Sequence, residues 1–114
     1  MSAIDLILLY DYYGDLLTDR QRECFELRYY QDFSLSEIGQ ELSISRQGVF
    51  DNLSRTEALL KKMEAKTGCV HRDRVCRKAA EKIRLLAQEL ENSSHRQTAD
   101  LAKQILTEVS ALEE

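Results

Sequence analysis

The stretch from residue 34 to residue 56 constrains the fold most, because it contains two helix-start signals separated by one short helical pattern. Ser34 and Glu37 are spaced so that each side chain can bond a free backbone N–H group in the first turn of a helix. Ser45 can cap a second helix after a turn at residues 43–44. A helix, a tight turn and another helix within about 20 residues form a helix-turn-helix pattern.

Apolar residues in this stretch recur at helical spacing. The first helix places Leu35, Ile38 and Leu42 on one side. Gly39 falls where the two helices of such a motif come closest, so we expect any side chain larger than alanine there to push them apart. In the second helix the inward positions follow steps of four, three, four and three, and they are Val49, Leu53, Thr56, Leu60 and Met63.

The rest of the chain is also predicted to be helical. It contains no proline and only four scattered glycines, and β-branched residues never alternate over a useful length. We therefore predict an all-α fold with a helix-turn-helix core (residues 4–66) and a C-terminal helical hairpin, organised as domains 1–67 and 68–114. Helices are expected over residues 4–13, from a cap at Thr18 to residue 31, in the motif up to about Thr67 and Gly68, and over residues 72–91 and 94–112.

The predicted hairpin carries one apolar seam. Its first helix keeps Val75, Ala79, Ile83, Leu86 and Leu90 on one side, and its second does the same with Leu101, Ile105, Val109 and Leu112. Such a seam needs a partner surface, which is either the helices of the motif or a second copy of the chain. We expect a homodimer.

Composition points to a cytoplasmic protein. The apolar run over residues 4–13 is interrupted by Asp5 and Asp11 and is far shorter than the ~20 residues of a membrane span. No basic segment precedes it, so we expect neither a signal peptide nor a membrane partner. Three cysteines, Cys24, Cys69 and Cys76, are an odd number that favours a reducing compartment.

Charge is distributed unevenly along the chain. The net charge is −4, which argues against strong nonspecific binding to nucleic acid, but residues 61–84 hold nine bases against three acids. This run can hold an RNA or DNA backbone, or it can be a solvated face balanced by acids elsewhere. The residues of this possible basic patch are Lys61, Lys62, Arg72, Arg74, Arg77, Lys78, Lys82 and Arg84.

The start of the second motif helix supplies the candidate nucleic-acid-binding residues, which are Ser45, Arg46, Gln47, Asn52 and Arg55. Arg46 has the donors to pair with a guanine, and Gln47 or Asn52 the amide to pair with an adenine. Phe50 and Asp51 fit a DNA reader less well, because an aromatic ring and a negative charge suit a protein contact or a stacked RNA base. Alternatively, Phe50 packs on a neighbouring helix.

Catalytic and metal-binding patterns are not recognisable. Cys69, His71 and Cys76 have a spacing that matches no familiar zinc site, and buried apolar cysteines are the alternative. Neither His71 nor His95 belongs to a nucleophile–base arrangement, and the glycines are not clustered as in phosphate-binding loops. We therefore expect a binding module that is not an enzyme and that uses no metal or cofactor.

The segment LTDRQRECFELRYYQDFSLSEIGQELSISRQGVFDNLSRTE resembles the promoter-binding fourth region of bacterial sigma factors and, more closely, the YlxM family of small bacterial helix-turn-helix proteins. The resemblance covers roughly residues 4–66. It implies a cytoplasmic, possible regulatory protein linked to the signal recognition particle, with the particle's GTPase or RNA as partner. Ser43 departs from the glycine usually favoured at the turn.

Three functions therefore remain open. The first is an accessory or regulatory protein of the signal recognition particle, as the resemblance implies. The second is a sequence-specific DNA-binding transcription regulator, as the motif alone implies. The third is a helical interaction module that has lost nucleic-acid binding and contacts proteins through Phe50 and its neighbours.

Overall fold

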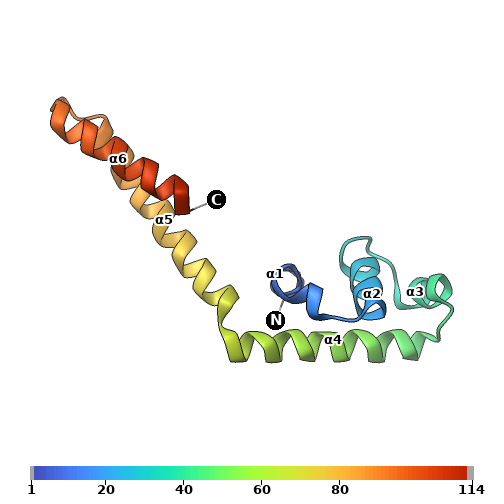
Figure 1. Cartoon of the computed structure of the whole chain (residues 1–114). Helices are drawn as coiled ribbons and strands as arrows, with labels where there is room; N and C mark the ends of the chain where they lie inside the picture. Colours follow the sequence, from blue (N-terminus) through green and yellow to red (C-terminus); the bar gives the residue numbers. More distant parts are fainter. Residues whose placement is uncertain (1, 113–114) are drawn as a thin grey trace. The chain divides into compact units, whose positions relative to one another are not determined.

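The structure, a computed structural model, describes residues 2–112, and the predicted all-α class is confirmed over this range. The chain forms two compact units, Met1–Val70 and His71–Glu114. Its elements in order are α1 (Ala3–Tyr13), the 3-10 turn η1 (Gly14–Leu16), α2 (Asp19–Tyr29), α3 (Leu35–Leu42), α4 (Arg46–Thr67), α5 (Cys69–Glu91) and α6 (Arg96–Leu112) (Figure 1).

Local caps set the helix starts in the N-terminal unit. The side chains of Ser2, Thr18 and Ser34 each accept a backbone N–H three residues on, and the residue at that position bonds back to complete a capping box. Ser45 caps α4 by accepting the N–H of Gly48 at 2.9 Å. The helix boundaries of the motif therefore lie where the spacing of its serines predicts them.

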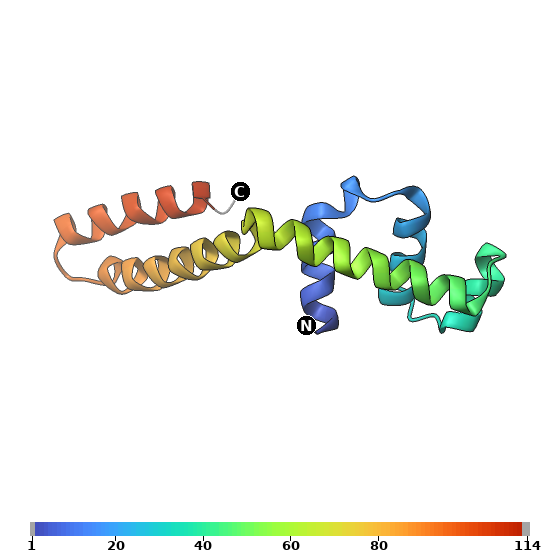
Figure 2. The same cartoon turned by 90° about the horizontal axis from the view of Figure 1, so that it is seen from below.

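In the N-terminal unit, α1, α2 and α3 lie on one side of α4 (Figure 1), and α1 crosses the C-terminal half of α4 in the second view (Figure 2). Large side chains fill the space between them. Phe25 is 1% exposed, and its ring stacks on that of Tyr10 with centroids 4.3 Å apart. A second cluster, Cys24, Ile38 and Val49, joins α2, α3 and α4.

Hydrogen bonds from Tyr13 fasten the C-terminal end of α4 to α1. The Tyr13 hydroxyl donates to Glu64 Oε1 at 2.8 Å and also hydrogen-bonds the hydroxyl of Thr67. Glu64 Oε1 in turn accepts the N–H of Val70 at 3.0 Å. Burial raises the pKa of the Tyr13 phenol further above its ordinary value, which is consistent with a hydroxyl that acts as a donor. Gly68 then ends α4 with a left-handed φ of 63°.

The C-terminal unit is a helical hairpin whose interior is made of small residues. The buried side chains are Ala80 and Ala87 on α5 and Ala102 and Val109 on α6, each pair seven residues apart on one side of its helix. The larger residues of the predicted seam remain mostly exposed: Val75, Ile83, Leu86, Leu90, Leu101, Ile105 and Leu112. The hairpin thus closes through three alanines and Val109, which is the buried member of the predicted seam. The two alanines of α5 lie on a different side of that helix from the predicted seam.

Candidate nucleic-acid interface

The α3–α4 turn depends on close backbone contact. Ser43 ends α3 with a left-handed φ of 58°, although serine is less suited to this conformation than glycine. The carbonyl of Gly39 then accepts the N–H of Ile44 at 2.9 Å. A Cβ atom on Gly39 would lie only 2.7 Å from the Ile44 carbonyl oxygen. The close approach predicted at Gly39 is therefore tighter than expected, because even the Cβ atom of alanine would displace the backbone of the turn.

Capping also gives Glu37 an electrostatic role at the start of α3. Its carboxylate accepts the backbone N–H of Ser34 at 3.1 Å, and this hydrogen bond lowers the pKa of Glu37 below its ordinary value. The side chain is exposed, so the effect on stability is small. The ionised carboxylate nevertheless helps to stabilise the first turn of α3.

Burial of one side of α4 decides which side chains can reach a partner. Val49, Thr56 and Leu60 are 0% exposed, so the opposite side of the helix faces outward. By helical spacing this outer side carries Gln47, Asp51, Ser54, Arg55 and Lys62, all of which are exposed. We call these five residues the outer face of α4.

The predicted readers are not all equally accessible. Arg46, Gln47 and Arg55 are exposed, and the last two lie on the outer face. Ser45 is exposed too, but its hydroxyl already serves as the helix cap. Asn52 is half-buried, and its Oδ1 is a buried atom without a hydrogen-bond partner in the structure. The structure thus exposes Arg46 and Gln47 at the start of α4 and Arg55 more than two turns further along the helix, and it turns Asn52 partly inward.

A hydrogen bond within the outer face joins Gln47 to Asp51. The Gln47 amide donates to Asp51 Oδ1 at 3.0 Å, one helical turn away. The bond orients the amide and leaves its carbonyl oxygen available as an acceptor. Asp51 keeps its negative charge near the start of α4, where it lowers the attraction for phosphate.

Phe50 is 52% exposed, so packing on a neighbouring helix accounts for no more than about half of its surface. It borders the outer face one turn after Arg46 and one turn before Ser54. An aromatic ring beside a cation and a hydroxyl group is a suitable platform for a base or for an apolar protein side chain.

The possible basic patch is divided between α4 and α5, and several of its members are paired with acids. Lys61 Nζ lies 2.9 Å from Glu57 Oε1, and Arg77 Nε lies 2.7 Å from Asp73 Oδ2. Arg84 pairs with Glu81. Helical spacing also distributes the bases of α5 around the helix instead of along one stripe. Lys62 is the member of the patch that extends the outer face of α4.

The sequence interpretation did not include Ser54 as a candidate. It lies between Phe50 and Arg55 on the exposed side of α4. Its position one turn after Phe50 and two turns after Gln47 was the available signal, because serine hydroxyls commonly contact phosphates. Ser54 therefore joins the outer face as a donor that carries no charge.

Within residues 2–112 no group of three or more histidine, cysteine, aspartate or glutamate side chains is arranged to hold a metal ion. Cys24 is buried, Cys69 is half-buried and Cys76 is exposed, and none of the three forms a disulfide bond. Burial raises the pKa of the Cys24 thiol, which makes it unreactive.

No helix in the described part of the chain is both long enough and apolar enough to cross a membrane.

Comparison with known proteins places this geometry in context. Residues 2–108 match the UPF0122 family, whose description is "Putative helix-turn-helix protein, YlxM / p13 like". A UPF0122 protein of Thermoanaerobacter sp. (strain X514) is 51% identical over 79 residues, covering 69% of this chain and 68% of the relative. A UPF0122 protein of Caldanaerobacter subterraneus is 52% identical over 79 residues, with the same coverage. The family match extends beyond residue 66 and includes most of the hairpin.

Proposed function

Because the chain belongs to the UPF0122 family of YlxM / p13-like helix-turn-helix proteins, we propose that it is a nucleic-acid-binding regulatory protein that acts through the start and the outer face of α4. One observation carries the proposal: Arg46 and Gln47 are exposed at the start of a helix that Ser45 caps and that α3 supports, and Arg55 is exposed further along its outer face. Helix-turn-helix proteins present base-reading side chains at this position.

The signal recognition particle is the proposed setting, with its RNA or its GTPase as the partner. The sequence resemblance to the YlxM family supports this choice. The exposed ring of Phe50 also supports it, since single-stranded RNA is commonly bound by stacking bases on aromatic side chains. Asp51 favours contacts to unpaired bases or to protein over contacts to a phosphate backbone, because a carboxylate on the outer face weakens the attraction for phosphates.

Sequence-specific DNA binding in the manner of a sigma-factor fourth region is the second candidate. Arg46 and Gln47 favour it, because their donors can pair with a guanine and an adenine in a major groove. The third candidate, a protein-interaction module, is favoured by the exposure of Phe50 alone. In all three cases we propose a cytoplasmic protein without enzymatic activity.

A second copy of the chain is the proposed partner of the C-terminal hairpin. The exposed seam on α5 and α6 supports this, because apolar faces of this size on soluble proteins generally mark an interaction site.

The deciding experiment measures binding of the full chain to the signal recognition particle RNA, an unrelated RNA, a library of DNA duplexes and the particle's GTPase. Each is titrated at about 50 and about 200 mM salt, because phosphate contacts weaken steeply with salt. We expect preferential binding to the particle RNA that falls at least about tenfold over this range. Salt-insensitive binding to the GTPase alone would leave the protein-interaction module, and binding to none of the four would contradict the proposal.

Matched variants locate the interface. Arg55→Ala should lower affinity for nucleic acid and reduce the salt slope by about 1, while Arg96→Ala on the hairpin should change neither. Phe50→Ala should cost about tenfold or more if a base stacks on the ring, and Phe50→Tyr should restore most of that loss. Equal effects of Arg55→Ala and Arg96→Ala on affinity would rule out α4 as the binding element.

A further inference from the structure

The hairpin exposes most of its large aliphatic side chains. On α5, Val75, Ile83, Leu86 and Leu90 are 44–54% exposed, whereas the alanines that face α6 are at most 5% exposed. On α6, Leu101, Ile105 and Leu112 are 38–75% exposed. We call these seven residues the open seam. Large aliphatic residues, which are normally buried, are exposed here, and the buried positions hold mainly alanines. A unit that is stable on its own has the reverse arrangement.

Helical geometry places both halves of the open seam on the same side of the hairpin. At about 100° per residue, the seam on α5 lies roughly a quarter turn from Ala80 and Ala87, and the seam on α6 lies roughly a quarter turn from Ala102 and Val109. The two offsets have the same sign when residues are counted along the chain. Because the helices run antiparallel (Figure 2), equal signs bring both halves to one face.

Each helix therefore has two apolar sides about 90° apart, one already packed and one open. This is the pattern of a helix in a four-helix bundle, where every helix packs against two neighbours. The hairpin supplies one neighbour for each helix and lacks the other. The open seam is the surface on which the missing pair of helices would pack.

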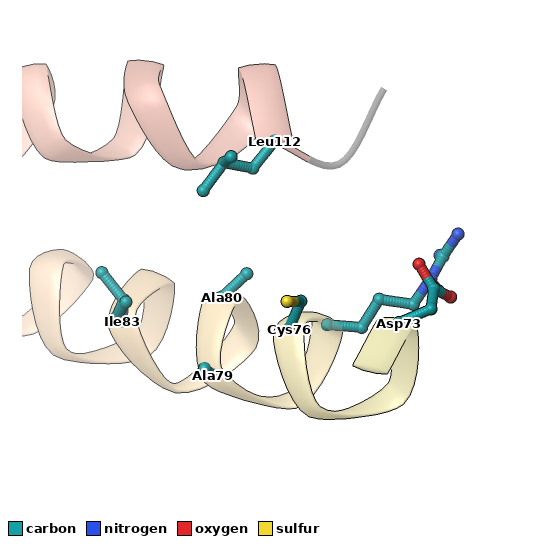
Figure 3. A pocket seen from close by; sticks show the side chains of 7 residues that line it. Asp73, Cys76, Ala79, Ala80, Ile83 and Leu112 are labelled. Atoms are coloured by element: carbon teal, nitrogen blue, oxygen red, sulfur yellow. Dashed lines mark hydrogen bonds and ion pairs between the residues drawn. The ribbon is translucent and has the colours of Figure 1, made fainter. Parts of the chain in front are cut away.

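A cavity of about 370 Å³ lies between α5 and the end of α6 and is not filled by the hairpin itself. Ala80, Cys76 and Ile83 line it from α5, and Leu112 lines it from α6 (Figure 3). Ile83 and Leu112 also belong to the open seam. The unfilled space is thus continuous with the exposed surface and is open to a side chain from a partner.

Charge at the edges of the open seam points to a second copy as the occupant. Lys78 and Lys82 border the seam near the middle of α5, Glu89 lies further along the same edge, and Glu108 borders the seam on α6. A two-fold axis parallel to the helices would place α5 of one copy over α6 of the other, so that these lysines meet Glu108. The other face-to-face arrangement places α5 over α5 and brings the lysines together, which is unfavourable.

We propose that two copies of the chain join through the open seam into a four-helix bundle in which α5 of each copy packs on α6 of the other. This inference rests on the proposed self-association and adds its surface and its orientation. Seven side chains that are about half exposed present on the order of 500 Å² of apolar surface, close to the largest patches of ordinary monomers. With the lysine and arginine stems beside them, this approaches the roughly 800 Å² that each partner buries in a standard interface.

The orientation has a consequence for the helix-turn-helix units. With α5 over the partner's α6, the two loops at residues 92–95 lie at one end of the bundle and both starts of α5 lie at the other. Both N-terminal units are then attached at the same end. Two helix-turn-helix units joined at one end of a bundle can bind one nucleic acid together, as in proteins that bind paired half-sites.

Leu86→Glu and Leu85→Glu provide a matched test. The two leucines are adjacent and equally exposed, at 54% and 53%, but Leu85 lies outside the open seam. Sedimentation of the full chain without nucleic acid should give twice the 13.2 kDa chain mass for the wild type and for Leu85→Glu. Leu86→Glu should weaken the dimer at least about 30-fold while helix content by circular dichroism is unchanged. A monomeric wild type at about 100 μM, or equal effects of the two substitutions, would overturn the inference.

Charge reversal tests the orientation. Lys82→Glu and Glu108→Lys should each weaken the dimer by about three- to tenfold, and the double variant should recover most of the wild-type affinity. No recovery in the double variant would overturn the pairing of α5 with the partner's α6. These measurements contain no nucleic acid, so their failure is separate from a failure of the RNA and DNA titrations.

Discussion

The N-terminal and C-terminal units use apolar residues in opposite ways. In the N-terminal unit the largest side chains, such as Phe25, Ile38 and Leu60, are at most 1% exposed, and three helices share α4 as a common support. In the hairpin the buried positions are mostly alanines and the leucines are outside. The comparison teaches that the first unit is complete as a folded core, whereas the second is built to receive another surface.

The sharpest test of this difference makes the same substitution in both units. Leu60→Ala removes a fully buried side chain and should destabilise the N-terminal unit by about 2–5 kcal/mol. Leu86→Ala should cost less than about 1 kcal/mol in dilute solution, because Leu86 is 54% exposed. Urea denaturation followed by circular dichroism measures both. Similar losses at the two positions would contradict the view that Leu60 lies in a packed core and Leu86 does not.

Gly39→Ala tests how tightly the N-terminal unit is packed at its turn. The new Cβ atom would clash with the Ile44 carbonyl, so we expect a loss of about 1–3 kcal/mol in the free energy of unfolding. Gln40→Ala is the control, since Gln40 is the exposed next residue of the same helix, and it should change stability by no more than about 0.5 kcal/mol. A neutral Gly39→Ala would show that the α3–α4 turn can widen.

Hydrogen exchange measures the difference in local stability between the two units without mutation. In dilute solution the amides of α5 and α6 should exchange at least about tenfold faster than those around Val49 and Leu60 in α4, because the hairpin has the weaker core. Raising the protein concentration should slow exchange in the hairpin and leave α4 unchanged, because self-association protects only the unit that it covers. Concentration-independent exchange in α5 and α6 would contradict this expectation.

The smallest expected effect concerns pH. Because the pKa of Glu37 is lowered in the folded state, its contribution to stability is present above the ordinary glutamate pKa of about 4.3 and is lost as pH falls through the lower folded value. Glu37→Gln keeps a capping side chain but cannot titrate. Between pH 7 and pH 3 the variant should lose about 1–2 °C less in Tm than the wild type. Identical pH profiles would show that this cap contributes nothing measurable.

Local features of the fold were predictable from the sequence, and long-range ones were not. The caps at Ser34 and Ser45 act within three residues, so spacing alone locates the starts of α3 and α4. The prohibition on a Cβ atom at Gly39 depends on where the Ile44 carbonyl lies, which only the folded turn defines. The partial burial of Asn52 could not be predicted from the sequence either, because it depends on how the other helices pack around α4.

The packing of the hairpin could not be predicted from the sequence for a second reason. Alanines occur on two sides of α5, at Ala79 and at Ala80 and Ala87, so periodicity cannot tell which side packs on α6. The seam with the larger residues was the natural choice, and it is the exposed one. Sequence patterns report the total apolar surface of a helix, but they do not report which neighbour covers each part of it.

The helix caps of the N-terminal unit also bear on how quickly it folds. Each of α1 to α4 carries its own start signal, at Ser2, Thr18, Ser34 and Ser45, so the helices can begin to form before they meet. Helical domains with mostly local contacts fold within microseconds to milliseconds. The chain contains no proline, so no slow prolyl cis/trans isomerisation delays the folding of a fraction of the molecules. The N-terminal unit can therefore be complete soon after its last residue leaves the ribosome.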